Sequence, residues 1–306
     1  MRPTPAITIL AGSALLLLSC REKARPPREF AGPASFSYIE TQVAFGPRVP
    51  GTRAHEQMGN WLDSLLRVRA DTLLVQSWNH VTSGGDTLPL RNFLARFNPA
   101  AEKHLLFLAH WDSRPVSDSP TSRDSSHAVM GANDGGSGVA LLLGVADVLK
   151  RTPSTIGVDL LFVDGEDYGD FTKSPADVLI GSRYYGAHQP PGPKPLYAVL
   201  FDLIADKDLQ IYQEGNSLVG APEVVELVWE TAKDLGYAGY FIASPRHTLI
   251  DDHLELQKVG IRAIDVVDFD YPAWHTQYDT IDKVSAASLQ VVGDVAVELV
   301  RRESRE

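Results

Sequence analysis

The stretch of sequence that decides the fold lies between residues 105 and 167 and has three parts: LLFLAHWDSRP (105–115), GGSGVALLLGVADVLK (135–150) and VDLLFVDGED (158–167). The first and third parts contain short, continuous apolar runs, which are typical of strands buried on both faces. The middle part opens with a glycine-rich turn and continues as a longer apolar run, which predicts a helix. This order indicates a sheet that is covered by helices on both faces.

The same alternation extends to both sides of this stretch. Upstream, apolar residues at helical spacing in 54–70 precede two strand-like segments at 72–82 and 88–97. Within and beyond the central stretch, we expect strands at 105–109, 158–163, 196–204 and 263–269, and helices at 138–150, 222–235 and 285–302. No Pro, Gly or Ser linker divides them, so the sequence predicts a single α/β domain over residues 36–306.

The composition fits a soluble globular domain, because 44% of the 306 residues are hydrophobic. The formal net charge is −11. A nucleic-acid-binding protein needs a basic surface, so this charge argues against nucleic acid as a partner. An acidic surface is compatible with amine-bearing substrates.

The first residues are expected to lie outside the folded domain. Arg2 precedes an apolar stretch (6–18) that is short for a membrane span, and LLSC ends at Cys20, the single cysteine. Residues 1–20 resemble a bacterial lipoprotein signal, in which the cysteine is lipidated; an ordinary cleaved signal peptide or a short anchor is the alternative. Residues 21–35 are basic and proline-rich and suit a flexible tether. We therefore expect an exported protein, lipid-anchored to the membrane at Cys20 on the periplasmic or cell-surface side.

Acidic and imidazole side chains recur near the ends of the predicted strands. Ligands of such sheets bind beyond the carboxyl ends of the strands, so we expect these side chains to meet there. They lie in HWDSRP (110–115), GANDGGSGVA (131–140), FVDGEDYGD (162–170), LFDLI (200–204) and YPAWHT (271–276).

Asp134, Asp167 and His275 are the expected ligands of a catalytic zinc, which takes three protein ligands and keeps one position open. Asp134 lies in a loop of small residues, and its carboxylate could bridge two metals. The alternative is that Asp134 is only the N-cap of the helix that follows it.

Glu166 is expected to transfer protons, as general base and then as general acid. It precedes Asp167, so the two side chains point in different directions, one toward the metal and one toward the substrate. A partly desolvated, acid-rich pocket would raise the pKa of Glu166 into the range that proton transfer requires. The alternative is a solvated turn.

Three further residues complete the predicted site. Asp202 ends an apolar strand and is either a metal ligand or an acceptor for a substrate amine, because an uncompensated buried carboxylate is costly. Asp251, beside Asp252, is either an active-site acid or a helix cap. Trp274 precedes His275 and would form an apolar wall that excludes water.

This ordered series of segments resembles the glutaminyl-peptide cyclotransferases of the animal type, which also occur in bacteria, within the superfamily of two-zinc aminopeptidases. The resemblance covers almost the whole chain after the signal. Its segments are FGPRVPG (45–51), RNFLARFNP (91–99), HWDSR (110–114), GANDGG (131–136), FVDGED (162–167), LFDLI (200–204), DDHLEL (251–256) and WHTQYDTIDKVS (274–285).

The resemblance implies a three-layer α/β/α sandwich around a twisted, mixed and mostly parallel sheet. It places the zinc ligands on Asp134, Asp167 and His275, and proton transfer on Glu166. Asp202 and Asp251 become active-site carboxylates, with Asp251 and Trp274 contacting substrate. The implied activity converts the N-terminal glutamine of peptides or proteins to pyroglutamate, releases ammonia and uses one zinc ion.

Two other functions remain open. His110 is present, so a second metal held by His110, Asp134 and Asp202 is chemically possible and would suit a zinc aminopeptidase. The GGSGVALLL helix start (135–143) also resembles the aminopeptidases, and Asp167 stands where animal cyclases commonly have Glu. The insertion DFTKSPADVLI (170–180) instead favours the cyclases. A non-catalytic binding module would be expected to lack some of these residues.

Overall fold

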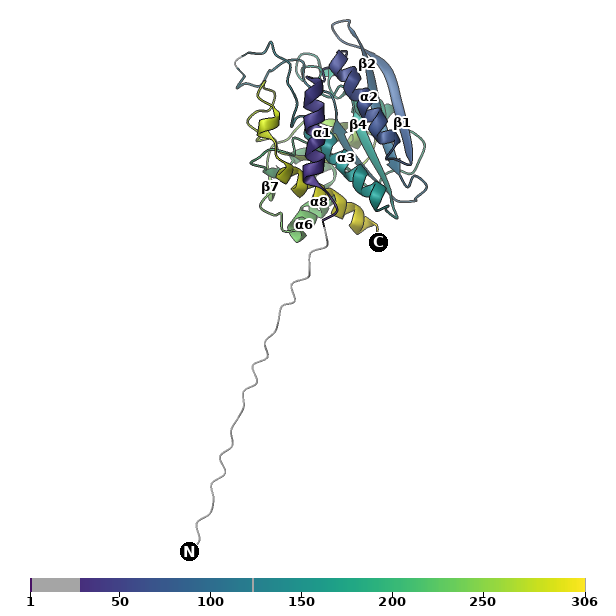
Figure 1. Ribbon diagram of the computed structural model, residues 1–306, viewed down its shortest axis with the longest axis vertical. Coiled ribbons are helices and arrows are strands. Elements are labelled where there is room, and N and C mark those ends of the chain that lie inside the picture. Colours follow the sequence, from purple (N-terminus) through teal and green to yellow (C-terminus); the bar gives the residue numbers. More distant parts are fainter. Residues whose placement is uncertain (2–27, 123, 306) are drawn as a thin grey trace.

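A six-stranded sheet forms the middle layer of the molecule in the computed structural model, which describes Met1, residues 28–122 and residues 124–305 (Figure 1). Its strand order is β1-β2-β4-β3-β5-β8. Four strands run parallel: β3 (His104–His110), β4 (Gly157–Val163), β5 (Ala198–Asp202) and β8 (Ala263–Val267). The antiparallel hairpin of β1 (Thr72–Val81) and β2 (Thr87–Phe97) extends the sheet beside β4. The predicted mixed, mostly parallel sheet is confirmed.

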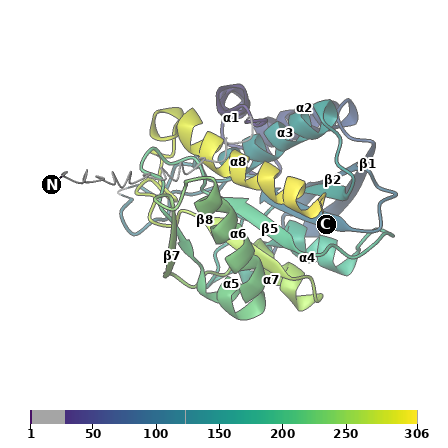
Figure 2. The ribbon, with the colours of Figure 1, turned by 90° about the horizontal axis from the view of Figure 1, so that it is seen from below.

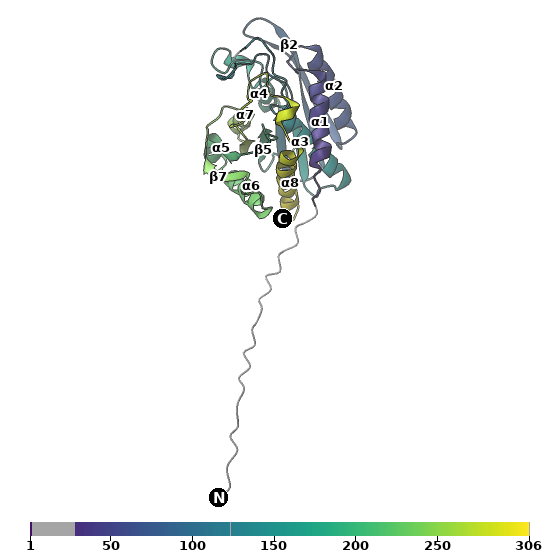
Figure 3. The same ribbon diagram turned by 60° about the vertical axis from the view of Figure 1, so that its left-hand side comes forward.

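Helices cover both faces of this sheet (Figure 2). One layer contains α1 (Gly32–Phe45), α2 (Arg53–Arg67), α3 (Gly136–Arg151) and α8 (Ala286–Glu303). The other contains α4 (Ile180–Ala187), α5 (Gly215–Gly220) and α7 (Asp252–Lys258). Figure 3 shows α1 and α2 on one side of β5 and α5 and α7 on the other. The three-layer α/β/α sandwich is therefore confirmed.

Smaller elements complete the fold at the β8 edge. The helix α6 (Pro222–Asp234) contacts both α5 and α8. The strands β6 (Ile211–Gln213) and β7 (Phe241–Pro245) form a separate parallel pair. Two 3₁₀ turns, η1 (Pro175–Asp177) and η2 (Ile281–Lys283), lie in the connections that precede α4 and α8.

The central strands are mostly apolar because both of their faces are buried. Along β3, Leu105 and Phe107 join the core beneath α1, α3 and α8, whereas Leu106 and Leu108 join the core on the opposite face. This alternation follows from the two-residue repeat of a strand. The sheet therefore separates two apolar layers, and two of its polar side chains, His110 and Asp202, lie at the carboxyl ends of their strands.

The predicted helices and strands all occur, with ends that differ by a few residues. The sequence did not predict α1, which begins at Gly32, so the expected tether ends four residues too late. Phe30, before α1, is already buried. The predicted signal segment and Cys20 lie outside the described residues. Within the described ranges, no helix is both long enough and apolar enough to span a bilayer.

Candidate metal centre and active site

Five of the predicted site residues converge at the carboxyl edge of the sheet. His110 ends β3 and Asp202 ends β5. Asp134 lies two residues before α3, Asp167 follows β4, and His275 follows β8. The parallel strands bring these side chains together from distant parts of the chain, as expected for a sheet of this type.

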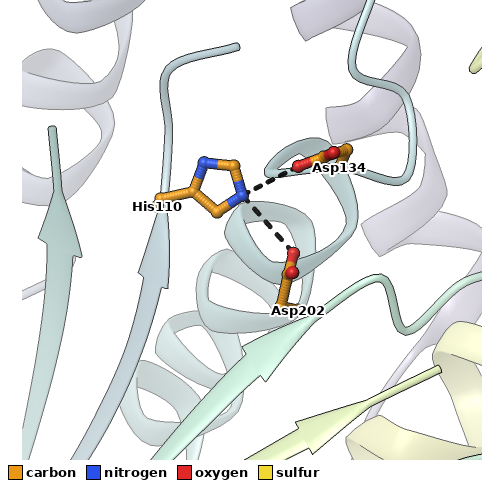
Figure 4. Close-up of side chains that lie close together, drawn as sticks. All are labelled: His110, Asp134 and Asp202. Atoms are coloured by element: carbon orange, nitrogen blue, oxygen red, sulfur yellow. Dashed lines mark ion pairs between the residues drawn. The ribbon is translucent and has the colours of Figure 1, made fainter. Parts of the chain in front are cut away.

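His110, Asp134 and Asp202 form one group of possible metal ligands (Figure 4). The Nε2 atom of His110 lies 3.1 Å from Oδ1 of Asp134 and 3.4 Å from Oδ1 of Asp202. In Figure 4 both carboxylates point toward the same nitrogen. These are the residues that the sequence suggested for a second metal.

Asp134, Asp167 and His275 form a second group, which is the expected ligand set of the first metal. The Nε2 atom of His275 lies 3.4 Å from Oδ1 of Asp167 and 3.8 Å from Oδ2 of Asp134. Asp134 belongs to both groups and offers one oxygen to each. The geometry therefore permits either one or two ions.

The polar atoms of these groups fit a metal because several of them are buried without a hydrogen-bond partner. They lie at ion-pair distances from each other but form no directed hydrogen bond. Buried polar atoms in folded proteins almost always have a partner, so a set of orphans in one place indicates a missing ligand. Imidazole nitrogen and carboxylate oxygen form a donor set that binds zinc well. The orphan atoms are both ring nitrogens of His110, Oδ2 of Asp134, Oδ2 of Asp167 and Oδ1 of Asp202.

The loop before α3 holds Asp134 in place through its backbone. Arg48 is fully buried and donates to the carbonyl oxygens of Met130 and Gly131 at 2.8 and 2.7 Å. The carboxylate of Asp279 accepts hydrogen bonds from the backbone N–H of Asp134. The N-cap position of α3 is Gly135, which has φ of +73°, so Asp134 does not cap this helix. Its side chain remains available to a metal.

Asp112 sets the directions of Glu166 and Asp167. Its two carboxylate oxygens accept hydrogen bonds from the backbone N–H groups of these neighbours, both at 3.1 Å. Asp167 then points toward His275, whereas Glu166 lines a neighbouring cavity. The expected divergence of the two side chains is present.

Glu166 is buried, and burial together with the nearby Asp167 raises its pKa well above the ordinary range. Asp167 behaves differently: burial would raise its pKa, but Arg114 and His275 lower it to about 2. Two adjacent carboxyl groups thus have pKa values pushed in opposite directions. This separation is typical of a proton-transfer group beside a charged ligand.

Asp251 caps a helix, which is one of the two roles that the sequence left open, and it also lies in the cavity wall. The helix is α7, and the side chain of Asp251 accepts from the N–H of Asp252. Burial and the neighbouring Asp202 raise its pKa well above the ordinary range.

The cavity beside the two ligand groups has a volume of about 280 Å³. Trp274 forms part of its wall and stacks on His275, with 3.8 Å between ring centroids. Phe171 contributes from the insertion at 170–180. The cavity is just below the usual size for drug-like ligands, which suits a single amino-acid residue. Its lining residues are Asp134, Glu166, Phe171, Asp202, Thr248, Leu249, Ile250, Asp251, Phe269, Trp274 and His275.

Two residues at the site have a backbone conformation that side chains other than glycine rarely adopt. His275 has φ of +54°, and Leu203, directly after Asp202, has φ of +52°. Such strain persists where the surrounding structure enforces it, and it is frequent at functional sites.

Besides Asp112, the sequence analysis missed two residues that contact the ligands, Asp118 and Arg114. Asp118 accepts from Nδ1 of His275 at 3.0 Å, and Arg114 bridges Asp118 and Asp167. Arg114 lies within the HWDSRP segment, but its partners are far away in sequence. The signal available in the sequence was an arginine four residues after His110, close to the end of a predicted strand.

Sequence comparison relates the chain to a peptidase family and to glutaminyl-peptide cyclotransferases. The profile of peptidase family M28 matches residues 92–300. Glutaminyl-peptide cyclotransferase of Gloydius blomhoffii is 27% identical over 245 residues, which cover 67% of this chain and 64% of that protein. The chain thus spans less than two thirds of that relative's length.

Solved structures agree with the fold. Glutaminyl cyclase of Porphyromonas gingivalis superposes with a TM-score of 0.86 at 33% identity, covering 90% of this chain and 99% of that one. A Zn-dependent exopeptidase of Parabacteroides distasonis gives a TM-score of 0.85 at 33% identity, with coverage of 89% and 98%. Since the M28 profile spans more than half of the sequence and includes every predicted ligand, the chain belongs to peptidase family M28.

Proposed function

We propose that this protein is a zinc-dependent glutaminyl-peptide cyclotransferase that acts on peptides or proteins with a free N-terminal glutamine. The observation that carries the proposal is the small cavity in which the buried acids Glu166 and Asp251 face the space beside a metal-ligand group. The similarity to the Porphyromonas gingivalis and Gloydius blomhoffii enzymes supports it.

Asp134, Asp167 and His275 would hold the zinc ion, since they form a ligand group of which Asp134 and His275 line the cavity. Zinc bound there would act as a Lewis acid on the γ-amide carbonyl of the glutamine. His110 and Asp202 would remain close to Asp134 without being needed for this ion.

Glu166 would move the proton. The α-amine nitrogen of the N-terminal glutamine attacks the Cδ atom of the same residue, and the new C–N bond closes a five-membered ring. Glu166 accepts a proton from that nitrogen. The same proton passes to the amide nitrogen as the Cδ–N bond breaks, and ammonia leaves. The raised pKa of Glu166 supports this role, because a group that both accepts and returns a proton needs a pKa near the working pH.

Asp202 and Asp251 would bind the α-amine of the substrate, because both carboxylates line the cavity. Trp274 and Phe269, whose ring centroids lie 4.8 Å apart, would pack against the glutamine side chain. Cyclisation consumes no water, so an apolar wall that keeps water from the carbonyl would favour ring closure over hydrolysis.

A zinc aminopeptidase is the second candidate function. The observation in its favour is the group of His110, Asp134 and Asp202, whose ligand atoms also lie close enough to share an ion. Two metals bridged by Asp134 would suit activation of a water molecule for hydrolysis.

The two candidates differ in their products. The zinc-loaded protein should be incubated with a glutaminyl peptide and with a leucyl peptide of the same remaining sequence, and both followed by mass spectrometry. The cyclotransferase removes one ammonia from the glutaminyl peptide and leaves the leucyl peptide intact. Release of free leucine or glutamine would contradict the proposal and support the aminopeptidase.

A further inference from the structure

We propose that Arg114 is a positioning residue: one guanidinium group holds both Asp167 and His275 in the geometry that binds a single zinc ion. The inference rests on the metal site of the proposed function but not on its reaction. Neither Arg114 nor Asp118 belongs to a ligand group, and the sequence analysis gave neither of them a role.

The first step is the arrangement of the guanidinium group. Arg114 is 3% exposed. Its Nε and Nη2 atoms donate to the two oxygens of Asp118 at 2.7 and 2.6 Å. Its Nη1 atom donates to Oδ1 of Asp167 at 2.5 Å and to the backbone oxygen of Asp167 at 3.3 Å. The planar fork thus binds two carboxylates at once, which a lysine cannot do in the same way.

The second step concerns His275. Its Nδ1 atom lies 3.0 Å from Oδ1 of Asp118, so we assign the ring proton to Nδ1. Nε2 then keeps its lone pair and faces Asp134 and Asp167. A carboxylate that orients a ligating histidine in this way also makes the ring a better donor. Because Asp118 is itself held by Arg114, the orientation of His275 depends on the arginine.

The third step concerns Asp167. Arg114 donates to its Oδ1 atom, which also lies 3.4 Å from Nε2 of His275, whereas its Oδ2 atom is buried and has no partner. The hydrogen bond from Arg114 leaves Oδ1 a weaker ligand than Oδ2, so Asp167 is expected to bind a metal through one oxygen. A carboxylate with one free oxygen fits the four-coordinate geometry that zinc prefers.

The positive charge of Arg114 also supports a positioning role. The ligand groups and their neighbours contain several carboxylates, and the guanidinium of Arg114 contacts two of them, those of Asp118 and Asp167. An arginine side chain is effectively always protonated, so Arg114 places a positive charge directly beside the carboxylate of Asp167. An adjacent positive charge favours the ionised carboxylate that ligation requires.

The test is the zinc affinity of the full chain, measured by competition with a chelating dye in the absence of substrate. Arg114→Met keeps the length of the side chain and removes the charge and the fork. We expect its zinc dissociation constant to rise by about 10-fold to 100-fold. Arg114→Lys can hold one carboxylate but not both, so its affinity should lie between those of the parent and Arg114→Met.

Arg96→Met is the matched control. Arg96 also forms a two-nitrogen contact with a buried carboxylate, that of Asp159, but at the other end of the strands. This variant should lose stability and keep the parental zinc affinity. If Arg96→Met weakens zinc binding as much as Arg114→Met does, the effect is a general loss of stability and the inference is wrong.

Cobalt substitution supplies a readout of geometry. With Oδ1 of Asp167 released in Arg114→Met, we expect a higher coordination number and a weaker visible absorption than in the cobalt-loaded parent. An unchanged spectrum together with an unchanged zinc affinity would overturn the inference.

If Arg114→Met does not fold, Asp118→Asn tests the same chain of contacts. This variant weakens the contact with Arg114, while its amide oxygen still accepts from His275. A parent protein that binds no zinc would overturn the metal centre itself, and a zinc-binding protein without cyclotransferase activity would leave this inference intact.

Discussion

Two clusters of arginine, aspartate and histidine lie at opposite ends of β3 and β4, and they differ in how fully their polar atoms are paired. At the amino end, His104 contacts Asp159 at 3.3 Å and the carbonyl oxygen of Ala101 at 3.0 Å, while Arg96 holds both oxygens of Asp159. None of these side-chain atoms is an orphan.

At the carboxyl end the same residue types leave atoms unpaired. Both ring nitrogens of His110 and one oxygen each of Asp134, Asp167 and Asp202 are buried without a hydrogen bond. The composition of a polar cluster therefore does not reveal function by itself. At the carboxyl end, the orphan atoms of several residues also lie at ion-pair distances from each other, and this combination indicates a missing ligand.

Glu166→Gln should produce the largest change in activity, because the carboxylate that carries the proton is lost while its shape is kept. We expect kcat for ammonia release from a glutaminyl peptide to fall by about 10²-fold to 10⁴-fold. Zinc content should match that of the parent, since Glu166 belongs to neither ligand group. Turnover within a few-fold of the parent would remove Glu166 from the mechanism.

Arg96→Met tests the paired cluster. Removing the arginine leaves the buried carboxylate of Asp159 without its main partner, which should lower the free energy of unfolding by about 3–5 kcal/mol. Urea denaturation measures this change, and kcat should stay close to the parental value. A variant with parental stability and lost activity would mean that the two clusters do not differ in the way described.

Removal of zinc should lower the free energy of unfolding, because the buried ligand atoms at the carboxyl end of β3 and β4 lose their partner. At a free zinc concentration about 100 times the dissociation constant, binding adds about 2.7 kcal/mol to the free energy of unfolding. Thermal unfolding of the chelated and zinc-loaded forms measures this increment. His275→Ala should abolish most of this zinc-dependent increment, and Arg96→Met should leave it unchanged. A melting temperature of the parent protein that does not change on addition of zinc would contradict the metal site.

Asp268 shows what an isolated orphan atom does, because it is a buried carboxylate with one unpaired oxygen outside both ligand groups. Burial raises its pKa to about 7, so the folded state holds a proton that the unfolded state has released. Its contribution to stability therefore falls as the pH rises from about 4 to about 7.

Asp268→Asn removes this penalty. We expect the variant to gain about 1 kcal/mol over the parent at about pH 8, and less at about pH 5, with activity unchanged. Urea denaturation at the two pH values measures the gain. A loss of activity would show that an isolated orphan can also mark a functional residue.

The sequence predicted those features that depend on position along a single strand or loop. His110, Asp202 and Asp167 follow apolar runs, so the edge of the sheet on which they lie could be inferred without a structure. The helix α1 was not predicted, since its segment GPASFSYIETQVAF follows a proline-rich stretch and has only a weak apolar stripe.

The features that the sequence could not provide depend on contacts between distant residues. Arg114 is separated from Asp167 by 53 residues, and Asp118 from His275 by 157, so no local sequence pattern predicts either contact. The positive φ angles of His275 and Leu203 are likewise imposed by the packing around them. Spacing could suggest which residues bind a metal, but not which residues hold those ligands in place.

The most direct test of the account is a zinc titration of the metal-free protein with cyclisation of a glutaminyl peptide as the readout. We expect ammonia release to rise with added zinc and to reach its maximum at one equivalent, with no free amino acid released. A maximum that requires two equivalents, accompanied by hydrolysis of the N-terminal residue, would contradict the one-metal cyclotransferase and assign the site to a two-metal aminopeptidase.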